Sequence, residues 1–113
     1  MTTTNKKMKT ITAKELKNWI DTSHTHQIID VREPWEREVG LIDGSCHIVM
    51  NTLAENLDQI RKDCDVVIHC RSGARSAAVT YHLVSQLGYE NVHNLEGGIT
   101  AWAEQVDPNV EIA

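Results

Sequence analysis

The sequence predicts an α/β fold in which helices cover a parallel sheet. Apolar runs suited to buried strands, at residues 27–31 and 65–69, and a further predicted strand at 91–95 alternate with stretches that carry helix signals. Strands that alternate with helices along a chain are typical of α/β architecture. With 113 residues, 41% of them hydrophobic, the chain is long enough for one domain with a real core and too short for two.

The first helix is predicted to begin at Ala13 and to end near Asp21. Thr12 and Glu15 have the spacing of a capping box, in which each side chain accepts a hydrogen bond from the other residue's backbone N–H. The apolar run Gln27–Val31 is predicted to follow as a short buried strand.

The middle of the chain is predicted to hold shorter elements. Glu33-Pro34 suits the first turn of a helix, because proline is tolerated where the N–H has no intrahelical partner. Cys46–Val49 is predicted to be the next strand. Thr52 and Glu55 repeat the capping-box spacing, which predicts a helix that continues to about Arg61.

The second half of the chain is predicted to contain the central strand, at residues 65–69. A helix over about residues 75–87 follows, and Gly88 would end it as a C-cap. A last strand at 91–95 and a last helix at 98–105 complete the alternation. The apolar residues expected on the buried side of the 75–87 helix are Ala77, Tyr81, Leu83, Val84 and Leu87.

Charge and polarity exclude two classes of partner. The net charge is −5, and beyond Lys6, Lys7 and Lys9 there is no basic cluster, so no nucleic-acid partner is expected. Residues 1–7 are polar and are expected to form a flexible tail before a single domain at 8–113. The tail lacks the apolar stretch of a signal peptide, and no apolar run approaches membrane-spanning length. We therefore expect a cytoplasmic protein with no membrane partner.

The cysteines are predicted to be free thiols. Cys46, Cys64 and Cys70 form neither an even-numbered framework nor a C-x-x-C pair, so each should be unpaired in a reducing compartment. The histidines and cysteines lack the ligand spacings of a zinc site, and there is no glycine-rich phosphate loop or dinucleotide fingerprint. The sequence therefore predicts no metal and no cofactor.

Residues 65–76, DVVIHCRSGARS, are the most informative stretch of the chain. An apolar strand leads directly into Cys70, which begins a tight turn that opens a helix. A thiol there faces unpaired backbone N–H groups, the positive end of the helix dipole, and the cations of Arg71 and Arg75. All three favour the thiolate, which is the nucleophilic form. Cys70 is therefore predicted to be reactive.

The spacing inside the loop separates two chemistries. The residues between Cys70 and Arg75 are Arg71, Ser72, Gly73 and Ala74, which gives the pattern C-x-x-x-x-R. Cysteine-dependent phosphatases and the arsenate reductases that resemble them have five residues there, which form a wider cradle for a tetrahedral oxyanion. The shorter loop predicts a narrower pocket, suited to one extra sulfur atom. A phosphatase or arsenate reductase is therefore the least favoured hypothesis.

Three motifs together resemble the rhodanese family of sulfurtransferases. They are Ile29–Glu36 followed by Gly40–Ser45, the loop that begins at Cys70, and Gly97–Trp102. The resemblance implies a mostly parallel central sheet with helices on both faces, and an active-site loop of six residues that begins with the catalytic cysteine. Ser72 occupies a position that is a second cation in some members that use thiosulfate well, which leaves the sulfur donor open.

The resemblance implies sulfur transfer through a persulfide. Cys70 would take the outer sulfur of a donor such as thiosulfate and pass it to a thiol or cyanide acceptor, while the N–H groups of the loop stabilise the charged sulfur. Arg71 is expected to steer the anionic donor, whereas Arg75 either faces the pocket or pairs with an acidic neighbour. Asp30 and Arg32 are expected to form a supporting buried pair beneath the loop.

Two sulfur-transfer hypotheses stay open. The first is an enzyme that acts on small-molecule donors and acceptors. The second is a sulfur-carrier or regulatory module that serves a protein partner. Residues 101–108 support the second hypothesis, because they resemble the ending of rhodanese domains fused to ubiquitin-like-protein activating enzymes.

Overall fold

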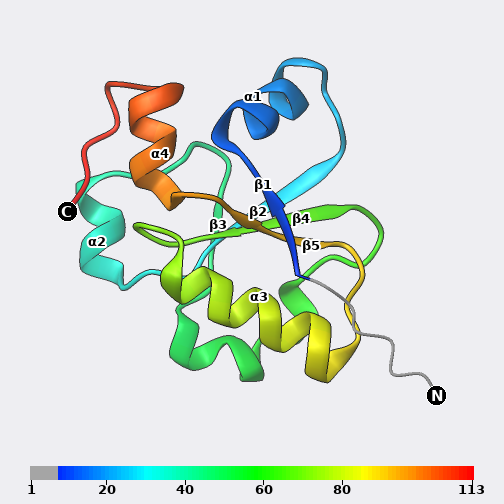
Figure 1. The fold of residues 1–113 in the computed structure, drawn as a ribbon. Helices are drawn as coiled ribbons and strands as arrows, with labels where there is room; N and C mark the ends of the chain where they lie inside the picture. Colours follow the sequence, from blue (N-terminus) through cyan, green and yellow to red (C-terminus); the bar gives the residue numbers. More distant parts are fainter. Residues whose placement is uncertain (1–7) are drawn as a thin grey trace.

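A five-stranded parallel sheet runs through the centre of residues 8–113, the part of the chain that the computed structural model describes (Figure 1). The strand order is β1-β5-β4-β2-β3, and every neighbouring pair is parallel. The strands are β1 (Lys9–Ile11), β2 (His26–Asp30), β3 (Cys46–His47), β4 (Asp65–His69) and β5 (Val92–Leu95). The predicted parallel sheet is confirmed, and the predicted tail at residues 1–7 lies outside the described residues.

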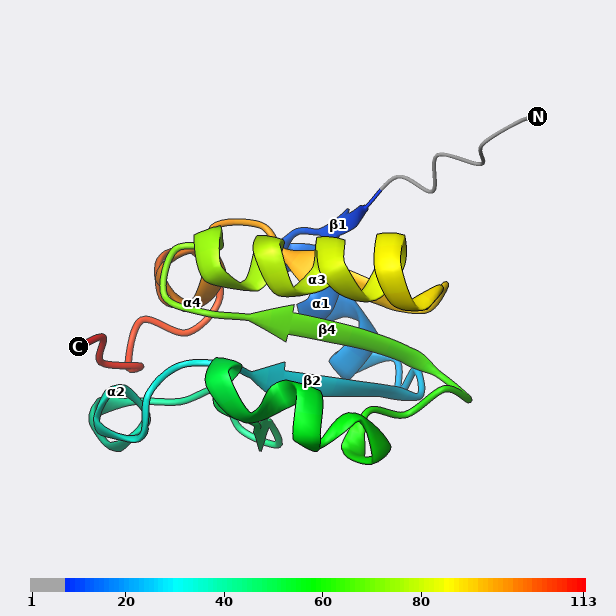
Figure 2. The same ribbon diagram turned by 90° about the horizontal axis from the view of Figure 1, so that it is seen from below.

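Helices cover both faces of this sheet. The helices are α1 (Ala13–Asp21), α2 (Pro34–Val39), α3 (Ala74–Leu87) and α4 (Gly98–Gln105), with two 3-10 helices, η1 (Met50–Glu55) and η2 (Leu57–Gln59). Figure 1 shows α1 and α4 on one face and α3 on the other. Figure 2, seen from below, shows α3 lying along β4. The expectation of helices on both faces is confirmed.

The core consists of two clusters, one on each face of the sheet. Successive side chains of a strand point to opposite faces, so Ile29, Val66 and Ile68 pack towards α3 and η1. Ile28 and Val67 pack towards α1 and α4. Each such residue is at most 4% exposed, and full burial of an aliphatic side chain contributes about 1.5–3 kcal/mol. The strands are therefore apolar on both sides, which explains their unbroken hydrophobic runs.

Local capping signals fix two helix boundaries as predicted. The N–H of Glu15 donates to the Thr12 hydroxyl (3.1 Å), and the N–H of Thr12 donates to the Glu15 carboxylate (2.9 Å). This capping box starts α1 at Ala13. Gly88 ends α3 in the left-handed conformation with φ 74°, as the C-cap prediction requires.

The second predicted capping box is wrong. Thr52 lies inside η1, and its hydroxyl donates to the carbonyl of Val49 (2.9 Å) instead of accepting from Glu55. The N–H of Met50 donates to the carbonyl of Val31 (3.1 Å). This bond fixes the start of the 3-10 turn at Met50, two residues before Thr52. The segment therefore forms two short 3-10 helices rather than one α-helix to Arg61.

Three further differences concern the edges of the fold. Strand β1 is not among the predicted elements, and β3 is shorter than predicted. Tyr81 and Leu87 are exposed, so the predicted buried side of α3 is wrong for these two residues. Ser76 and Val79 are buried in their place, together with the predicted Leu83 and Val84. Among residues 8–113, no helix has both the length and the apolar character needed to cross a membrane.

Candidate active site

Cys70 lies at the carboxyl end of the central strand, where a tight loop joins β4 to α3. The loop begins directly after His69 and ends at Gly73, the residue before the helix. Gly73 has φ 105°, a left-handed conformation that side chains disfavour, and this lets the chain turn sharply into the helix. The Cys70 side chain is buried at 1% exposure. A reactant must therefore enter the loop to reach the sulfur.

Three hydrogen-bond donors converge on the Cys70 sulfur. The N–H of Gly73 lies 3.1 Å from Sγ, and both the N–H and the hydroxyl of Ser76 lie 3.4 Å from it. Donors arranged in this way form a nest that stabilises negative charge. Two come from the first turn of α3 and its cap, where N–H groups have no intrahelical partner.

These donors decide the ionisation of Cys70. Burial raises the pKa of the thiol, since a charge in an apolar site loses its hydration. Hydrogen bonds from the Ser76 hydroxyl and from the N–H groups of Ser76, Gly73 and Ser72 act in the opposite direction. The net effect is a pKa below the ordinary value of a cysteine. This favours the nucleophilic thiolate.

Arg75 pairs with an acidic neighbour. Its guanidinium donates to both carboxylate oxygens of Glu36, at 2.7 and 2.8 Å. The Arg75 hydrogen bonds lower the pKa of Glu36, despite its partial burial. The pair ties α2 to the first turn of α3, so of the two alternatives for Arg75 the structure has the ion pair.

Arg71, Ser72 and Ala74 are exposed around the loop. Within residues 8–113 no acidic side chain pairs with the guanidinium of Arg71, which leaves it available to an anion from solvent. The Arg71 carbonyl is held in place, since it accepts from both the N–H and the hydroxyl of Thr100, at 3.0 and 2.9 Å. The loop backbone is thus fixed while its side chains face outwards.

Asp30 and Arg32 form the expected pair, and both are fully buried. The Arg32 guanidinium donates to the two Asp30 oxygens at 3.0 and 2.8 Å, and also to the carbonyl of Gly40 at 2.8 Å. The backbone N–H of Arg32 also donates to Asp30, at 3.0 Å, and Arg37 adds a further donor at 3.2 Å. Burial raises the pKa of Asp30, but the hydrogen bonds and charge of Arg32, together with the nearby His69, outweigh it and bring the pKa to about 2. The pair stays charged at neutral pH.

His69 is buried between this pair and the loop backbone. Its Nδ1 lies 3.2 Å from the carbonyl of Cys70, and its Nε2 lies 3.9 Å from Asp30. Burial lowers the pKa of His69 to about 4, so the ring is neutral at pH 7. Neither ring nitrogen bonds the sulfur. Within residues 8–113, no three His, Cys, Asp or Glu side chains are grouped to hold a metal ion.

Most of the chain matches a known protein family. Residues 12–105 match the family described as Rhodanese-like domain. The chain belongs to this family. The rhodanese resemblance of its motifs is therefore confirmed, and the matched range includes the loop that begins at Cys70.

Similar proteins include named sulfurtransferases. The chain is 38% identical to "Putative sulfurtransferase YtwF" of Bacillus subtilis, over 89% of this chain and 96% of that protein. It is 36% identical to "Probable adenylyltransferase/sulfurtransferase MoeZ" of Mycobacterium tuberculosis, over 89% of this chain but 26% of that protein. The chain thus spans about a quarter of the length of the mycobacterial relative. A rhodanese-like domain protein from Staphylococcus aureus has a TM-score of 0.80 and 39% identity, covering 94% of this chain and 99% of its own.

The turn between β5 and α4 forms the outer wall of the rhodanese loop. The N–H of Ile99 donates to the Cys70 carbonyl at 2.9 Å. Gly98 lies so close that a Cβ on it would stand 2.5 Å from the Arg71 oxygen and 2.6 Å from the Cys70 oxygen. Glycine is therefore required at this position by contact as well as by its φ of 59°.

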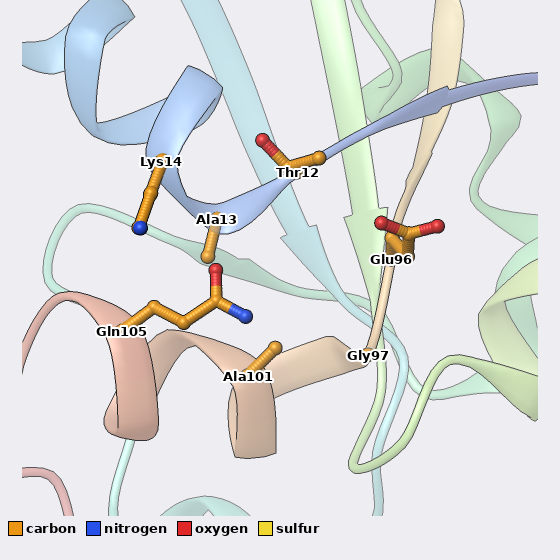
Figure 3. Close-up of a pocket in the computed structure, with 7 residues that line it drawn as sticks. All are labelled: Thr12, Ala13, Lys14, Glu96, Gly97, Ala101 and Gln105. Carbon is orange, nitrogen blue, oxygen red and sulfur yellow. The ribbon is translucent and has the colours of Figure 1, made fainter.

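A cavity of about 450 Å³ lies beyond this wall, between α1 and α4 (Figure 3). It is lined by Thr12, Ala13, Lys14, Glu96, Gly97, Ala101 and Gln105. Gly97 lies between this cavity and the loop. A Cβ atom added to Gly73 would stand 3.4 Å from the Gly97 nitrogen. The residues that line this cavity do not include Cys70, so it is distinct from the space around the sulfur.

Sequence reasoning missed two residues of this rhodanese domain's candidate site. Ser76 contacts the sulfur, and Asn94 on β5 contacts Ser76. The signal for Ser76 was its place directly after Arg75, at the start of the predicted helix. The signal for Asn94 was an amide near the carboxyl end of the predicted strand at 91–95, where active-site residues of parallel sheets gather.

Proposed function

We propose that this protein is a sulfurtransferase that moves a sulfane sulfur from a donor such as thiosulfate to a thiophilic acceptor, through a persulfide on Cys70. The observation that carries the proposal is the convergence of the Gly73 and Ser76 donors on one buried sulfur. Sulfur transfer in general is supported by relatives named as sulfurtransferases. The donor, the persulfide and the roles of the loop residues are our proposal.

The reaction proceeds in two steps. The Cys70 thiolate attacks the outer sulfur of thiosulfate, the S–S bond of the donor breaks, and sulfite leaves with the electron pair. An acceptor such as cyanide then attacks the terminal sulfur of the persulfide and leaves as thiocyanate, which returns Cys70 to the thiolate. A covalent intermediate of this kind gives ping-pong kinetics. The loop donors stabilise the sulfur whenever it carries charge.

The charged side chains in and beneath the loop have different proposed roles. Arg71 is exposed and free of an acidic partner within the described residues, so it meets the anionic donor at the mouth of the loop. Arg75 is committed to Glu36 and acts through the position of α3. Asp30 and Arg32 support the strand end beneath the loop, as a buried structural pair.

A protein acceptor is the second candidate for the same chemistry. The mycobacterial relative carries both adenylyltransferase and sulfurtransferase in its name, and this chain matches about a quarter of it. A domain related to part of such a protein suits a sulfur relay between proteins. Free thiols at Cys46, Cys64 and Cys70 suit a reducing compartment, and we include a cytoplasmic location in the proposal.

Intact-mass measurement tests the proposal. Incubation with thiosulfate should add the mass of one sulfur atom, and cyanide should remove it. Cys70→Ser should abolish the adduct, whereas Cys46→Ser and Cys64→Ser should retain it. Burial raises the pKa of Cys64, which makes it a poor nucleophile and a suitable control.

Two outcomes would contradict the proposal. A label on Cys46 or Cys64 would show that another residue is the nucleophile. Hydrolysis of aryl phosphates that depends on Cys70 and matches the rate of sulfur transfer would favour the phosphatase hypothesis instead.

A further inference from the structure

Behind Cys70 lies a buried pair of polar side chains, Ser76 and Asn94, that the reaction described above does not use in full. Ser76 is fully buried and Asn94 is 6% exposed. The Ser76 hydroxyl lies 2.6 Å from the Asn94 carbonyl oxygen Oδ1, and 3.4 Å from the Cys70 sulfur. A buried polar atom without a hydrogen-bond partner lowers the stability of the folded protein, so each of these contacts affects the energy of the site.

The orientation of the Asn94 amide is fixed by the loop. Its Nδ2 lies 3.3 Å from the carbonyl oxygen of Gly73, which only accepts hydrogen bonds. A flipped amide would place two acceptors against each other there. Oδ1 therefore faces Ser76, and since Oδ1 also only accepts, the short contact requires the Ser76 hydroxyl to be the donor.

A hydroxyl has a single proton to donate. Three acceptors lie within reach of the Ser76 hydroxyl: Asn94 Oδ1 at 2.6 Å, the Gly73 carbonyl at 3.3 Å and the sulfur at 3.4 Å. Ser76 therefore cannot donate fully to Asn94 and to the sulfur at once. While Cys70 is a neutral thiol, the closer amide oxygen is the better acceptor. When the sulfur becomes a thiolate, the charge makes it the stronger acceptor, since hydrogen bonds to charged groups are about twice as strong as neutral ones.

We propose that Asn94 is a positioning residue that competes with the Cys70 sulfur for the hydroxyl proton of Ser76. The hydroxyl donates to Asn94 while the sulfur is neutral and rotates to the sulfur when the thiolate forms. The O–H bond stays intact throughout, and the thiol proton itself leaves to solvent. The inference rests on the proposed role of Cys70 as nucleophile and adds the regulation of its charge.

The competition predicts opposite shifts in the pKa of Cys70 for the two residues, which a merely structural role does not. Removing the Asn94 acceptor should free the Ser76 hydroxyl for the sulfur and lower the pKa of Cys70. Removing the hydroxyl should raise that pKa. The titratable and charged groups around the loop are Arg71, the Arg75–Glu36 pair, His69 directly before Cys70, and the Asp30–Arg32 pair beneath it. All of them are the same in every variant compared.

The test is the pH titration of the ultraviolet absorbance of the Cys70 thiolate, in a Cys46→Ser/Cys64→Ser background where no other thiol contributes. Asn94→Leu, which is similar in size but accepts no hydrogen bond, should raise the thiolate fraction below the pKa roughly threefold to tenfold, where tenfold corresponds to one pKa unit. Ser76→Ala should lower that fraction. In Ser76→Ala, adding Asn94→Leu should change nothing further, because no hydroxyl is left to compete for.

Asn94→Val is the second acceptor-free variant, chosen because β-branched residues suit a strand, and it serves if the leucine variant does not fold. The inference is overturned if the folded acceptor-free variant keeps or raises the pKa of Cys70, or if its effect persists without the Ser76 hydroxyl. Failure of the proposed function is distinguishable, because it would appear as no sulfur adduct on Cys70 while the titration pattern holds.

Discussion

Replacing Arg32 with methionine tests whether the pair beneath the loop is structural. The guanidinium is fully buried and donates to both oxygens of Asp30 and to the carbonyl of Gly40. Methionine fills much of the same space but provides none of these donors. The carboxylate of Asp30 then remains buried with Arg37 as its nearest cation, at 3.2 Å.

The expected loss of stability is large for a protein of this size. Breaking a buried ion pair by removing one partner costs about 3–5 kcal/mol, against a typical total of about 5–15 kcal/mol. Because Arg37 still pairs with Asp30, we expect the lower end, about 3 kcal/mol. This corresponds to a fall in Tm of roughly 10–15 °C. Asp30→Asn/Arg32→Met should recover part of the loss, since it removes the buried charge as well.

The loss should also depend on pH. The pKa of Asp30 is lowered from 3.8 to about 2 in the folded protein, so its ionised form contributes stability above the unfolded pKa. That contribution, of about 2–3 kcal/mol, is lost as the pH falls through about 2. The difference between wild type and Arg32→Met should therefore be widest above about pH 4 and should narrow towards pH 2.

Urea unfolding followed by circular dichroism, between pH 7 and the acid limit, measures these differences. Arg61→Met is the matched control, because Arg61 makes a similar pair with Asp63 (2.9 Å) on the exposed surface and should change stability little. A loss below about 1 kcal/mol for Arg32→Met, comparable to a surface pair, would refute the reasoning. So would a loss that is the same at every pH.

Two further predictions concern the loop. Arg71→Ala should raise the KM for thiosulfate more than it lowers kcat, because its charge would stabilise the bound donor and the transition state equally. Steady-state kinetics measure both constants. An unchanged KM would mean that another group steers the donor. Gly98→Ala should lower the rate of sulfur transfer about 100-fold, since its Cβ would stand 2.5 Å from the Arg71 oxygen and displace the loop. Gly88→Ala, at a similar φ but with nothing within 4 Å, should leave the rate unchanged; equal losses in both variants would contradict a contact effect.

The parts of the fold that the sequence predicts well are those set by nearby residues. The start of α1 depends on Thr12 and Glu15, and the end of α3 depends on Gly88, so both boundaries agree with the structure. The same capping-box pattern is wrong at Thr52, because the contact that decides there comes from Val31, directly after β2 and about 20 residues earlier in the chain. Strand β1 exists only through its pairing with β5, which is distant in sequence.

The candidate site divides in the same way. The position of Cys70 between a strand and a helix is evident from contiguous residues. The choice of Arg75 between two partners depends on Glu36, 39 residues earlier, and no local pattern contains it. Ser76 on α3 and Asn94 on β5 are 18 residues apart in sequence, and the packing of the helix against the sheet brings them together.

The place of the wall residues in the chain has a consequence for the protein's synthesis. On a ribosome, Cys70 emerges before Asn94 and Gly98, which enclose its loop in the folded protein. At about 5–20 residues per second, the gap lasts roughly 1–6 s. During that interval the thiol has neither its wall nor the hydrogen bonds that lower its pKa, so it is mostly a neutral thiol. Cys70 should therefore become reactive towards oxidants only as the chain folds, and newly made chains should form less sulfenic acid there than mature ones.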